Sequence, residues 1–149
     1  MSLTTYKKKR KFSETPEPEG KVVKRGKKLI FVIHRHAARN LHYDLRLEMS
    51  GVLASWAVPK EPPKTKAEKR LAIQVEDHPL QYAKFHGVIP EGNYGAGKVE
   101  IWDKGNYELF ERTPKKILFA LHGKKLSGKY VLIKTGYGGK KSGWLWFKV

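Results

Sequence analysis

From residue 29 to its C-terminus, the chain is a series of short segments rich in β-branched and aromatic residues, separated by Gly, Pro, Asn or Lys. Segments of this kind predict β-strands. With about nine short strands and no long amphipathic helix, we expect an all-β fold whose mostly antiparallel sheet forms a barrel or two packed sheets. The predicted strands are residues 29–34, 41–49, 52–58, 71–76, 98–103, 107–111, 117–121, 129–134 and 144–149.

Two short runs have the composition of hairpin turns. Met49-Ser50-Gly51 separates two of the predicted strands, and Lys104-Gly105-Asn106 separates two others. Residues 115–122 also fit two turns of helix, so the strand predicted there has a helical alternative.

Residues 1–28 differ from the rest in composition. They are rich in Lys, Glu, Pro and Thr and hold few apolar residues, so they cannot bury enough surface to fold by themselves. We therefore predict a basic, largely irregular N-terminal arm at residues 1–28 and one folded domain at residues 29–149. The run Lys7-Lys8-Lys9-Arg10-Lys11 within the arm fits a nuclear-import signal, a phosphate-binding arm or a solvated tail.

The chain is strongly basic. Its 149 residues include 31 Lys and Arg against 14 Asp and Glu, for a net charge of +17. The arm, with 10 basic and 3 acidic residues, accounts for +7, which leaves +10 on the predicted domain. A folded body of this charge attracts polyanions, of which nucleic-acid backbones are the commonest, although a surface that only favours solubility is the alternative.

Several classes of protein are excluded or disfavoured by composition. The chain has no cysteine, so disulfides and thiolate metal sites are impossible, and any metal must be held by His, Asp or Glu. The longest apolar runs, residues 29–33 and 116–121, are far shorter than a membrane span, and no apolar signal-peptide stretch opens the chain. We therefore expect a soluble, cytoplasmic protein, and a basic monomer.

One predicted strand has one apolar face and one ionisable face. Because side chains alternate along a strand, residues 41–48 divide into two sets. A half-buried strand with a solvated outer face shows the same alternation, but such a face is usually built from Thr, Lys, Ser and Glu. The apolar set is Leu41, Tyr43, Leu45 and Leu47, and the ionisable set is His42, Asp44, Arg46 and Glu48.

His42 and Asp44 are spaced to bind one divalent ion together. A third ligand is needed, and His34, His36, His78 and His86 are the candidates. A mixed nitrogen and oxygen set suits Mn²⁺, Zn²⁺, Fe²⁺ or Co²⁺. Arg46 lies two residues further along the same face, where its planar guanidinium is suited to phosphate oxygens.

A second group of candidates follows the strand that ends near residue 76. His78 in Asp77-His78-Pro79 fits a structural turn, and it also fits a phosphate contact or a proton donor, since the ordinary pKa of histidine lies near neutrality. Most aromatic residues are expected in the core, while Tyr94, in a glycine-rich loop, is a candidate for stacking on a base.

Taken in order along the chain, these motifs resemble one family, the 3'-phosphoesterase domain of the multifunctional ligase D proteins and its stand-alone archaeal and bacterial relatives. The resemblance runs from Phe12 to the C-terminus. The runs that carry it are Phe12-Ser-Glu-Thr-Pro-Glu17, His36, Leu41-His-Tyr-Asp-Leu-Arg-Leu-Glu48, Gly51-Val-Leu-Ala-Ser-Trp-Ala-Val-Pro-Lys60, Lys69-Arg-Leu-Ala72, Val75-Glu-Asp-His-Pro-Leu80 and Ile89-Pro-Glu-Gly-Asn-Tyr-Gly-Ala-Gly97.

The resemblance implies a small antiparallel β barrel of about eight to nine strands and an Mn²⁺-dependent hydrolase, with Co²⁺ or Zn²⁺ as other metals. Such an enzyme removes a 3'-terminal ribonucleoside as a phosphodiesterase, and then the 3'-phosphate as a phosphomonoesterase, to leave a 3'-hydroxyl during DNA end repair by non-homologous end joining. The implied partners are DNA or DNA–RNA primer-template 3' ends, together with separate ligase, polymerase or end-binding proteins.

The resemblance also implies roles for particular residues. His36, His42 and Asp44 would bind the metal. Arg46, His78 and Tyr82 would be catalytic, with Arg46 and His78 on the scissile phosphate. Lys60 and Arg70 would add to phosphate or substrate binding, and Glu17 and Glu76 would support the site. Relatives often carry an acidic residue immediately before Phe12, where this chain has Lys11, so a role of that position in the diesterase step is not carried over.

Two other functions fit parts of the sequence. A non-catalytic nucleic-acid-binding module would use the basic surface and the aromatic residues alone. An iron oxygenase with two histidines and one carboxylate would use His42, Asp44 and a distant histidine such as His78, and would leave His36 without a metal.

Overall fold

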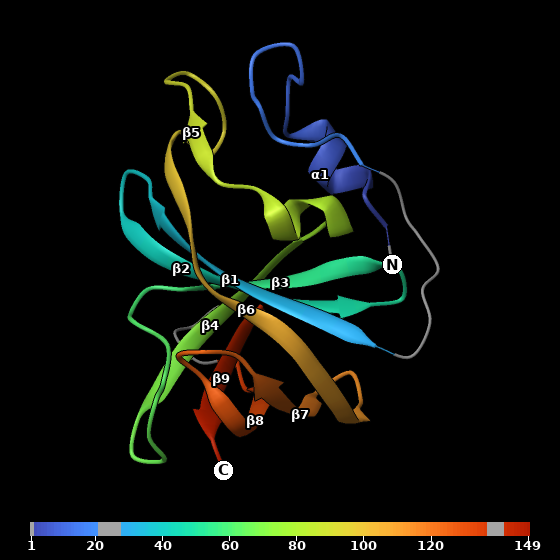
Figure 1. Cartoon of the computed structure of the whole chain (residues 1–149), viewed down its shortest axis with the longest axis vertical. Helices are drawn as coiled ribbons and strands as arrows, with labels where there is room; N and C mark the ends of the chain where they lie inside the picture. The colour runs from blue at the N-terminus through green and yellow to red at the C-terminus, as the bar shows by residue number, and fades with distance from the viewer. Residues whose placement is uncertain (1, 21–27, 137–141) are drawn as a thin grey trace.

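The computed structural model describes residues 2–20, 28–136 and 142–149. Within them lie nine strands, one short α-helix and one 3₁₀ turn (Figure 1). None of the described helices is long and apolar enough to span a membrane. In chain order the elements are α1 (Thr4–Lys8), β1 (Leu29–Ala37), β2 (Leu41–Met49), β3 (Val52–Val58), β4 (Lys69–His78), η1 (Leu80–Lys84), β5 (Gly87–Ile89), β6 (Gly97–Arg112), β7 (Lys116–His122), β8 (Ser127–Lys134) and β9 (Gly143–Lys148).

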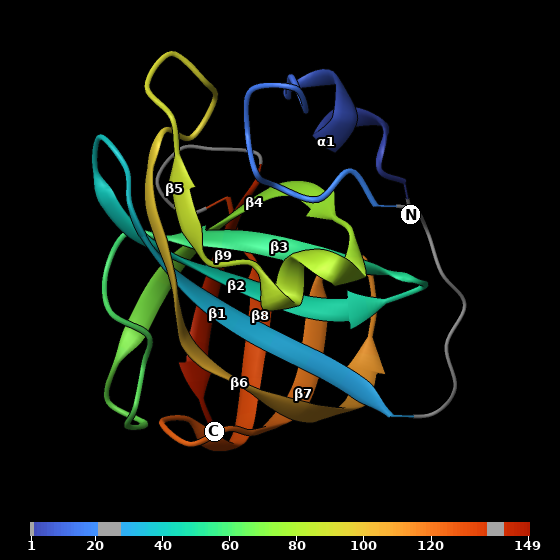
Figure 2. The ribbon, with the colours of Figure 1, turned by 45° about the horizontal axis from the view of Figure 1, so that its top comes forward.

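Eight of the strands form a closed antiparallel barrel. The order of neighbours is β1-β2-β3-β4-β9-β8-β7-β6, and β6 pairs back with β1 (Figure 2). The ninth strand, β5, pairs with the start of β6 outside this ring. The predicted all-β fold is confirmed, and the barrel is the correct one of its two alternatives. Closure leaves the eight strands of the ring without the long free edges that promote aggregation.

The barrel is filled by apolar side chains from every strand of the ring, most of them large. Trp56, Phe119, Leu45 and Trp146 are among its fully buried members. Tyr43, Leu45 and Leu47 all belong to this interior cluster, so the predicted apolar face of residues 41–48 does face the core. Burial of aromatic side chains of this size supplies most of the favourable free energy available to a small β domain.

The turn predicted at Met49-Ser50-Gly51 is confirmed. Met49 pairs with Val52, and the two residues between them have positive φ, at 50° for Ser50 and 84° for Gly51. This is the backbone of a two-residue hairpin turn whose twist matches that of the strands.

The turn predicted at Lys104-Gly105-Asn106 is wrong, because β6 runs through it without interruption. Gly105 serves a different need. A Cβ on it would collide with the backbone carbonyl of His122 and press on the ring of Phe31, so the glycine allows a neighbouring strand to approach. The helical alternative for residues 115–122 is also wrong, since residues 116–122 form strand β7.

A second apolar cluster lies outside the barrel, on the outer face of β1 and β3. Val32 and Leu53 contribute from these strands, while η1 contributes Tyr82 and the N-terminal segment contributes Tyr6. The outer face of this part of the barrel is therefore covered by two segments, as Figure 2 shows for residues 2–20 and for η1 with β5.

The N-terminal segment departs from the irregular arm that its composition predicts. Thr4–Lys8 form helix α1, and Tyr6 is fully buried, with its hydroxyl bonded to the carbonyl of Pro18 and its ring against His78 and Tyr82. The segment needs no core of its own because it packs on the apolar cluster of the barrel. The predicted boundary near residue 28 stays a prediction, since residues 21–27 lie outside the described residues.

Replacement of Tyr6 tests this docking. We expect Tyr6→Ala to lower the free energy of unfolding by about 3–5 kcal/mol, as for other large buried aromatic residues. Phe110→Ala, at a side chain that is 49% exposed, is the control and should cost no more than about 0.5 kcal/mol. Guanidinium unfolding followed by tryptophan fluorescence measures both, and equal losses would show that the segment does not dock in solution.

Candidate metal centre and phosphate pocket

A cavity of about 270 Å³ lies on the outer face of β1, β2 and β4, beneath the two covering segments. Strand alternation places the ionisable face of β2 here, and this face is buried instead of solvated. Asp44, Arg46 and Glu48 are 4%, 3% and 2% exposed. The polar residues that line the cavity are Arg10, Glu17, His36, His42, Asp44, Arg46, Glu76, His78, Tyr82 and Tyr94.

Three residues at one end of the cavity are arranged to hold a metal ion. His36 on β1 stands directly opposite His42 on β2, and Asp44 is two residues further along β2. One ligand atom from each lies within 4.8 Å of the others. The Oδ2 atom of Asp44 is 3.3 Å from Nε2 of His42 and 3.7 Å from Nδ1 of His36.

The ring nitrogens of both histidines point the correct way for metal binding. Nε2 of His36 lies 2.6 Å from the carbonyl oxygen of Gly95, and Nδ1 of His42 lies 3.1 Å from that of Asn40. In each ring the nitrogen beside a carbonyl carries a proton and donates it, so the nitrogen facing Asp44 is the one that can bind a metal after giving up any proton of its own. His36, His42 and Asp44 therefore fit a divalent metal with mixed nitrogen and oxygen ligands.

Asp44 is held in its ionised form. Burial alone would raise its pKa, but the Arg46 guanidinium and the hydrogen bonds from His36 and His42 outweigh burial, so the pKa of Asp44 lies well below its ordinary value. For His42, burial lowers the pKa, but the contact with the Asp44 carboxylate outweighs it, and the pKa is raised. In the metal-free protein, Asp44 thus supplies the charge that a cation needs.

Arg46 is fixed by a chain of hydrogen bonds that runs through His34. Nε2 of His34 lies 2.9 Å from the carbonyl oxygen of Phe85, and Nε of Arg46 donates to Nδ1 of His34 at 3.2 Å. The guanidinium also lies 4.9 Å from the ring centroid of Tyr82, and its Nη2 is 3.3 Å from Asp44 Oδ2. Its Nη1 atom is buried and has no hydrogen-bond partner among the described residues.

The N-terminal segment brings a second guanidinium into the cavity. Nε of Arg10 pairs with Oε2 of Glu17 at 2.8 Å, and Nη1 pairs with Oε2 of Glu76 at 3.1 Å. Glu17 also accepts a hydrogen bond of 2.8 Å from the Tyr82 hydroxyl. Glu17 and Glu76 therefore support the site by holding Arg10 and Tyr82 in place.

His78 lies in the cavity, but without the near-neutral pKa that would suit a proton donor. Burial, with the nearby Arg46 and Arg10 charges, lowers the pKa of His78 well below its ordinary value. Nη2 of Arg10 is 3.2 Å from its Nε2, and its Nδ1 lies 3.0 Å from the carbonyl oxygen of Glu76. A neutral imidazole that donates from Nδ1 and accepts at Nε2 matches both contacts.

Tyr82 keeps its proton. Burial, together with the Glu17 carboxylate, raises the pKa of its hydroxyl well above the ordinary value, although Arg46 and Arg10 act in the opposite direction. Its ring lies under Arg46 and against His78.

Lys60, Arg70 and Lys11 stand outside the cavity. Lys60 is exposed in the loop after β3, and Arg70 donates to the carbonyl of Glu61 and to the carboxylate of Glu68. Lys11 is exposed and lies 3.9 Å from Glu14. The structure thus brings together eight of the residues expected in the site, and leaves Lys60 and Arg70 apart from them.

His78 does not join the metal group, which among the described residues consists of His36, His42 and Asp44. The oxygenase alternative requires the opposite assignment of His36 and His78, so the geometry does not favour it.

Sequence reasoning missed two residues of this site. Arg10 stood in a basic run for which a phosphate-binding arm was only one of three interpretations, and the run alone does not single out one buried member. His34 was considered only as a metal ligand, whereas its contacts hold Arg46. Alternation along β1 places both His34 and His36 on the outer face, and only the cross-strand contacts separate their roles.

Comparison with known proteins identifies the family of the chain. Residues 34–134 match the family described as the DNA Ligase D 3'-phosphoesterase domain. The chain belongs to this family. The resemblance inferred from the motifs is therefore confirmed, and His36, His42, Asp44, Arg46, His78 and Tyr82 all lie within the matched residues of this 3'-phosphoesterase domain.

Similar full-length proteins carry the same name. The chain is 50% identical over 155 residues to the multifunctional non-homologous end joining protein LigD of Mycolicibacterium smegmatis. This alignment covers 96% of the chain and 20% of the relative. It is 48% identical over 154 residues to LigD of Pseudomonas aeruginosa, in an alignment that covers 98% of the chain and 18% of that relative. The 3'-phosphoesterase domain described here thus spans about a fifth of the length of these curated relatives.

The buried His34 predicts how the free energy of unfolding depends on pH. Burial, with the Arg46 charge, lowers the pKa of His34 to about 3, against an ordinary value of 6.5. Between these values the unfolded chain binds a proton at His34 and the folded protein does not, so stability should fall as the pH drops below 6.5. His34→Gln keeps a donor and an acceptor but cannot titrate.

We therefore expect unfolding of His34→Gln to take up one proton fewer than the unchanged protein between pH 4 and 6. Denaturant unfolding across this range measures the difference. The control is His122→Gln, the same substitution at an exposed histidine of β7. A profile for His34→Gln that parallels the unchanged protein would contradict the assignment.

Proposed function

We propose that the chain is a metal-dependent phosphoesterase that processes the 3' ends of nucleic acid in non-homologous end joining. It would remove a 3'-terminal ribonucleoside as a phosphodiesterase, then the 3'-phosphate as a phosphomonoesterase, to leave a 3'-hydroxyl. The observation that carries the proposal is the buried Nη1 of Arg46 beside the metal-binding group, without a partner among the described residues. A buried guanidinium donor of this kind is costly unless a ligand oxygen completes it.

His36, His42 and Asp44 would hold the ion, with Mn²⁺ proposed and Co²⁺ or Zn²⁺ as other metals that suit these ligands. When bound, a divalent ion supplies electrophilic stabilisation of the charge that develops on phosphate oxygens. The protein's own part is to place the three ligand atoms on one side of the cavity before the ion arrives, so that little reorganisation is needed.

Arg46 would hold the scissile phosphate beside the metal ligands, since its Nη2 lies 3.3 Å from Oδ2 of Asp44. Its Nε bond to His34 and its contact with the Tyr82 ring leave Nη1 free to donate to a non-bridging oxygen. Arg10 also lies at the cavity, where the Glu17 and Glu76 carboxylates pair with its charge and fix its direction. An oriented guanidinium such as Arg46 stabilises a phosphoryl transition state by electrostatics, without a covalent intermediate.

We assign His78 and Tyr82 to the catalytic group in roles that their protonation states allow. His78 is neutral near pH 7, so it would accept the Arg10 hydrogen bond at Nε2 and orient this guanidinium next to the phosphate. Tyr82 remains protonated and would keep Arg46 and Glu17 in register through its ring and its hydroxyl. Lys60 and Arg70, outside the cavity, would contact the substrate further from the reacting phosphate.

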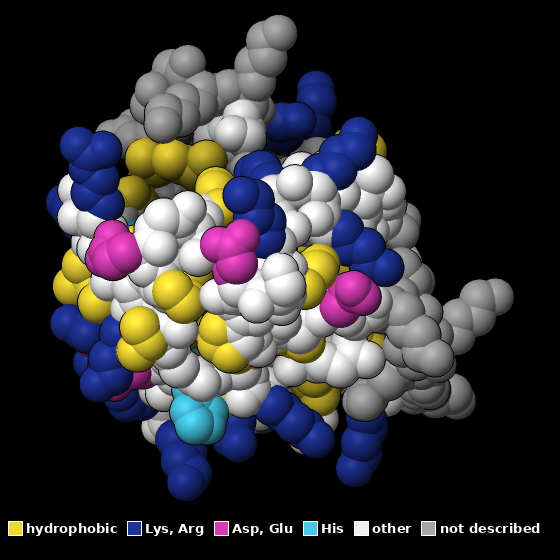
Figure 3. All heavy atoms as spheres, turned by 90° about the horizontal axis from the view of Figure 1, so that it is seen from above, with side chains coloured by type: hydrophobic (Ala, Val, Ile, Leu, Met, Phe, Trp, Pro, Cys, Tyr) yellow, Lys and Arg dark blue, Asp and Glu magenta, His cyan; other side chains and the backbone are white. Residues whose placement is uncertain are grey.

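The proposed substrates are DNA or DNA–RNA primer-template 3' ends, and the face around the cavity suits them. Lys and Arg side chains outnumber acidic ones on the face that carries the N-terminal segment and β5 (Figure 3). The names of the relatives place LigD in end joining. From these we infer a cytoplasmic protein that works with ligase, polymerase or end-binding activities.

The decisive assay uses a 5'-labelled primer-template that ends in one 3' ribonucleotide, with Mn²⁺. We expect shortening to a 3'-phosphate end and then to a 3'-hydroxyl end. Asp44→Ala removes the carboxylate ligand and should abolish both steps, a loss of at least about 10³-fold. If the primer stays intact with several divalent metals while the protein still binds it, the chain is a non-catalytic binding module instead.

Arg46→Lys tests the phosphate contact separately from the metal. Lysine keeps the positive charge but loses the planar pair of donors, so kcat should fall by about 10²–10³-fold. Metal binding, followed by calorimetry with Mn²⁺, should persist. Arg35→Lys, at a partly exposed arginine of β1 that lies 3.8 Å from Glu100, is the matched control and should keep its activity. Equal activity in the two variants would remove Arg46 from the reaction.

A further inference from the structure

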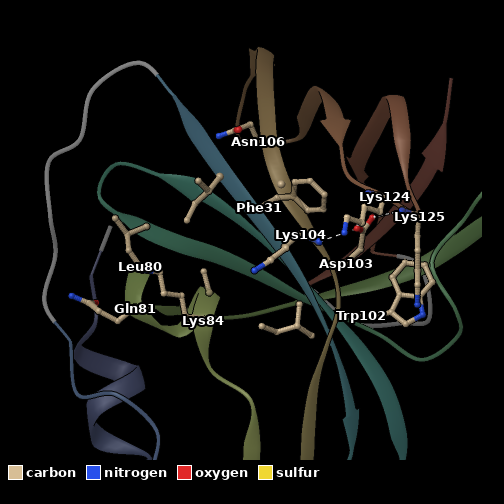
Figure 4. Close-up of a pocket in the computed structure, with 14 residues that line it drawn as sticks. Phe31, Leu80, Gln81, Lys84, Trp102, Asp103, Lys104, Asn106, Lys124 and Lys125 are labelled. Atoms are coloured by element: carbon tan, nitrogen blue, oxygen red, sulfur yellow. Dashed lines mark hydrogen bonds between the residues drawn. The ribbon is translucent and has the colours of Figure 1, made fainter.

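A second and larger hollow, of about 800 Å³, lies on the outside of the barrel apart from the metal group. We call it the lysine groove. It is bounded by η1 on one side, by the start of β1 and the middle of β6 along its length, and by the turn between β7 and β8 at its far end (Figure 4). None of the metal, Arg46 or Arg10 contacts described above uses a residue of this groove.

The lining of the lysine groove is apolar. Ile30 and Ile101 come from the outer face of β1 and β6, and Leu80 and Ala83 come from η1. Trp102 is partly buried toward the far end, with the ammonium group of Lys125 4.6 Å from its ring centroid. An apolar hollow of this size on a protein of net charge +17 is suited to a ligand with flat apolar surfaces.

The rim of the lysine groove is cationic. Lys84, Lys104, Lys124 and Lys125 are all exposed along it. The one acidic residue in the described lining, Asp103, is buried and already satisfied. Its carboxylate accepts backbone N–H bonds from Lys104, Lys124, Lys125 and Leu126 at 2.9–3.1 Å.

These bonds make Asp103 a support for the cationic rim, because it folds the turn that presents Lys124 and Lys125. Gly123 precedes them, and a Cβ there would collide with the Asp103 carboxylate. The charge that remains open to a ligand at the rim is therefore positive.

The lysine groove and the metal group share strand β1, which supplies Ile30 to the groove and His36 to the metal group. On the β1–β6 ladder His36 pairs with Val99, and Ile30 pairs with Asn106. Ile30 and His36 are six positions apart on β1, which corresponds to about 20 Å of strand. This distance corresponds to about six nucleotides of a stacked strand at 3.4 Å each. Both sites also share η1, whose Tyr82 lines the metal cavity and whose Leu80 and Lys84 line the groove.

We propose that, when the 3' end of a duplex occupies the metal cavity, the lysine groove binds the unpaired part of the opposite strand. Phosphates would lie along the lysines of the rim, and base faces would lie on the apolar lining. This inference deepens the proposed function and rests on it for the position of the 3' end. It predicts a preference for ends whose opposite strand extends beyond the processed terminus.

Single-stranded nucleic acid fits the lysine groove better than two other occupants. A duplex presents phosphates to a protein surface but hides its base faces in the stack, so it would leave the apolar lining unused. An acidic peptide could pair with the lysines, but a peptide offers no repeated flat surfaces spaced along a regularly charged backbone.

The test measures binding without catalysis. Two labelled duplexes with the same paired length and 3'-hydroxyl ends are compared by fluorescence anisotropy in EDTA, one blunt and one with a 5' overhang of several nucleotides. The unchanged protein should bind the overhang duplex about tenfold more tightly. Lys84→Glu with Lys104→Glu should abolish this preference and lower the salt dependence of overhang binding by about 1–2 in slope.

The matched control is Lys66→Glu with Lys129→Glu, which makes the same change in charge at exposed lysines outside the lysine groove and the metal cavity. It should keep the preference for the overhang, and thermal unfolding of both double variants checks that they fold. Equal overhang preference in the groove and control variants would overturn the proposal. So would groove-dependent binding of an acidic peptide while the preference for the overhang persists, which would make the groove a peptide-docking surface.

Asp44→Asn separates this inference from the proposed function. This substitution removes a metal ligand, so the variant should lose any phosphoesterase activity and still prefer the overhang duplex in EDTA. A protein with no phosphoesterase activity but with overhang binding that depends on Lys84 and Lys104 would refute the proposed function and leave the groove proposal standing.

Discussion

Buried charge on the outer face of β2 is the constraint on which the rest of this structure depends. Asp44, Arg46 and Glu48 are almost completely removed from water, yet they lie on the side of the strand away from the barrel core. Unpaired charges in such a place would cost several kcal/mol each, so every one must find a partner. Asp44 meets two histidines and Arg46, and Glu48 accepts the backbone N–H of Ile30. The Nη1 atom of Arg46 is left without a hydrogen-bond partner among the described residues, and an oxygen atom of a ligand would supply one.

The covering segments follow from the same constraint. The N-terminal segment packs on the barrel through Tyr6, and its Glu17 and Arg10 enter the cavity as a buried pair. A buried ion pair is weak evidence for stability, because its desolvation offsets much of its attraction. Its use here is geometric, since Glu17 binds both Arg10 and Tyr82 and so links a segment near the start of the chain to η1. The shape of the site thus depends on contacts between residues 65 positions apart.

The sequence predicted the parts of this molecule that depend on local periodicity. The alternation of residues 41–48 was enough to place His42, Asp44 and Arg46 on one face of the strand, and the positive-φ turn after Met49 could be predicted from Ser-Gly composition. It failed where long-range contacts decide the outcome. Residues 104–106 have turn composition, but Gly105 is needed against a neighbouring strand. Arg10 looks like its basic neighbours, and only its contacts with Glu17 and Glu76 distinguish it. His36 and His34 share one face, and the preference for His36 came from family resemblance.

The two sites described here divide the faces of η1. A 3₁₀ turn repeats every three residues, so even a five-residue element presents different side chains in different directions. Tyr82 contacts Arg46 and Glu17 on one side, while Leu80 and Lys84 line the lysine groove on another. Leu80 and Tyr82 are two residues apart in this turn, so the lysine groove and the metal cavity share one structural element.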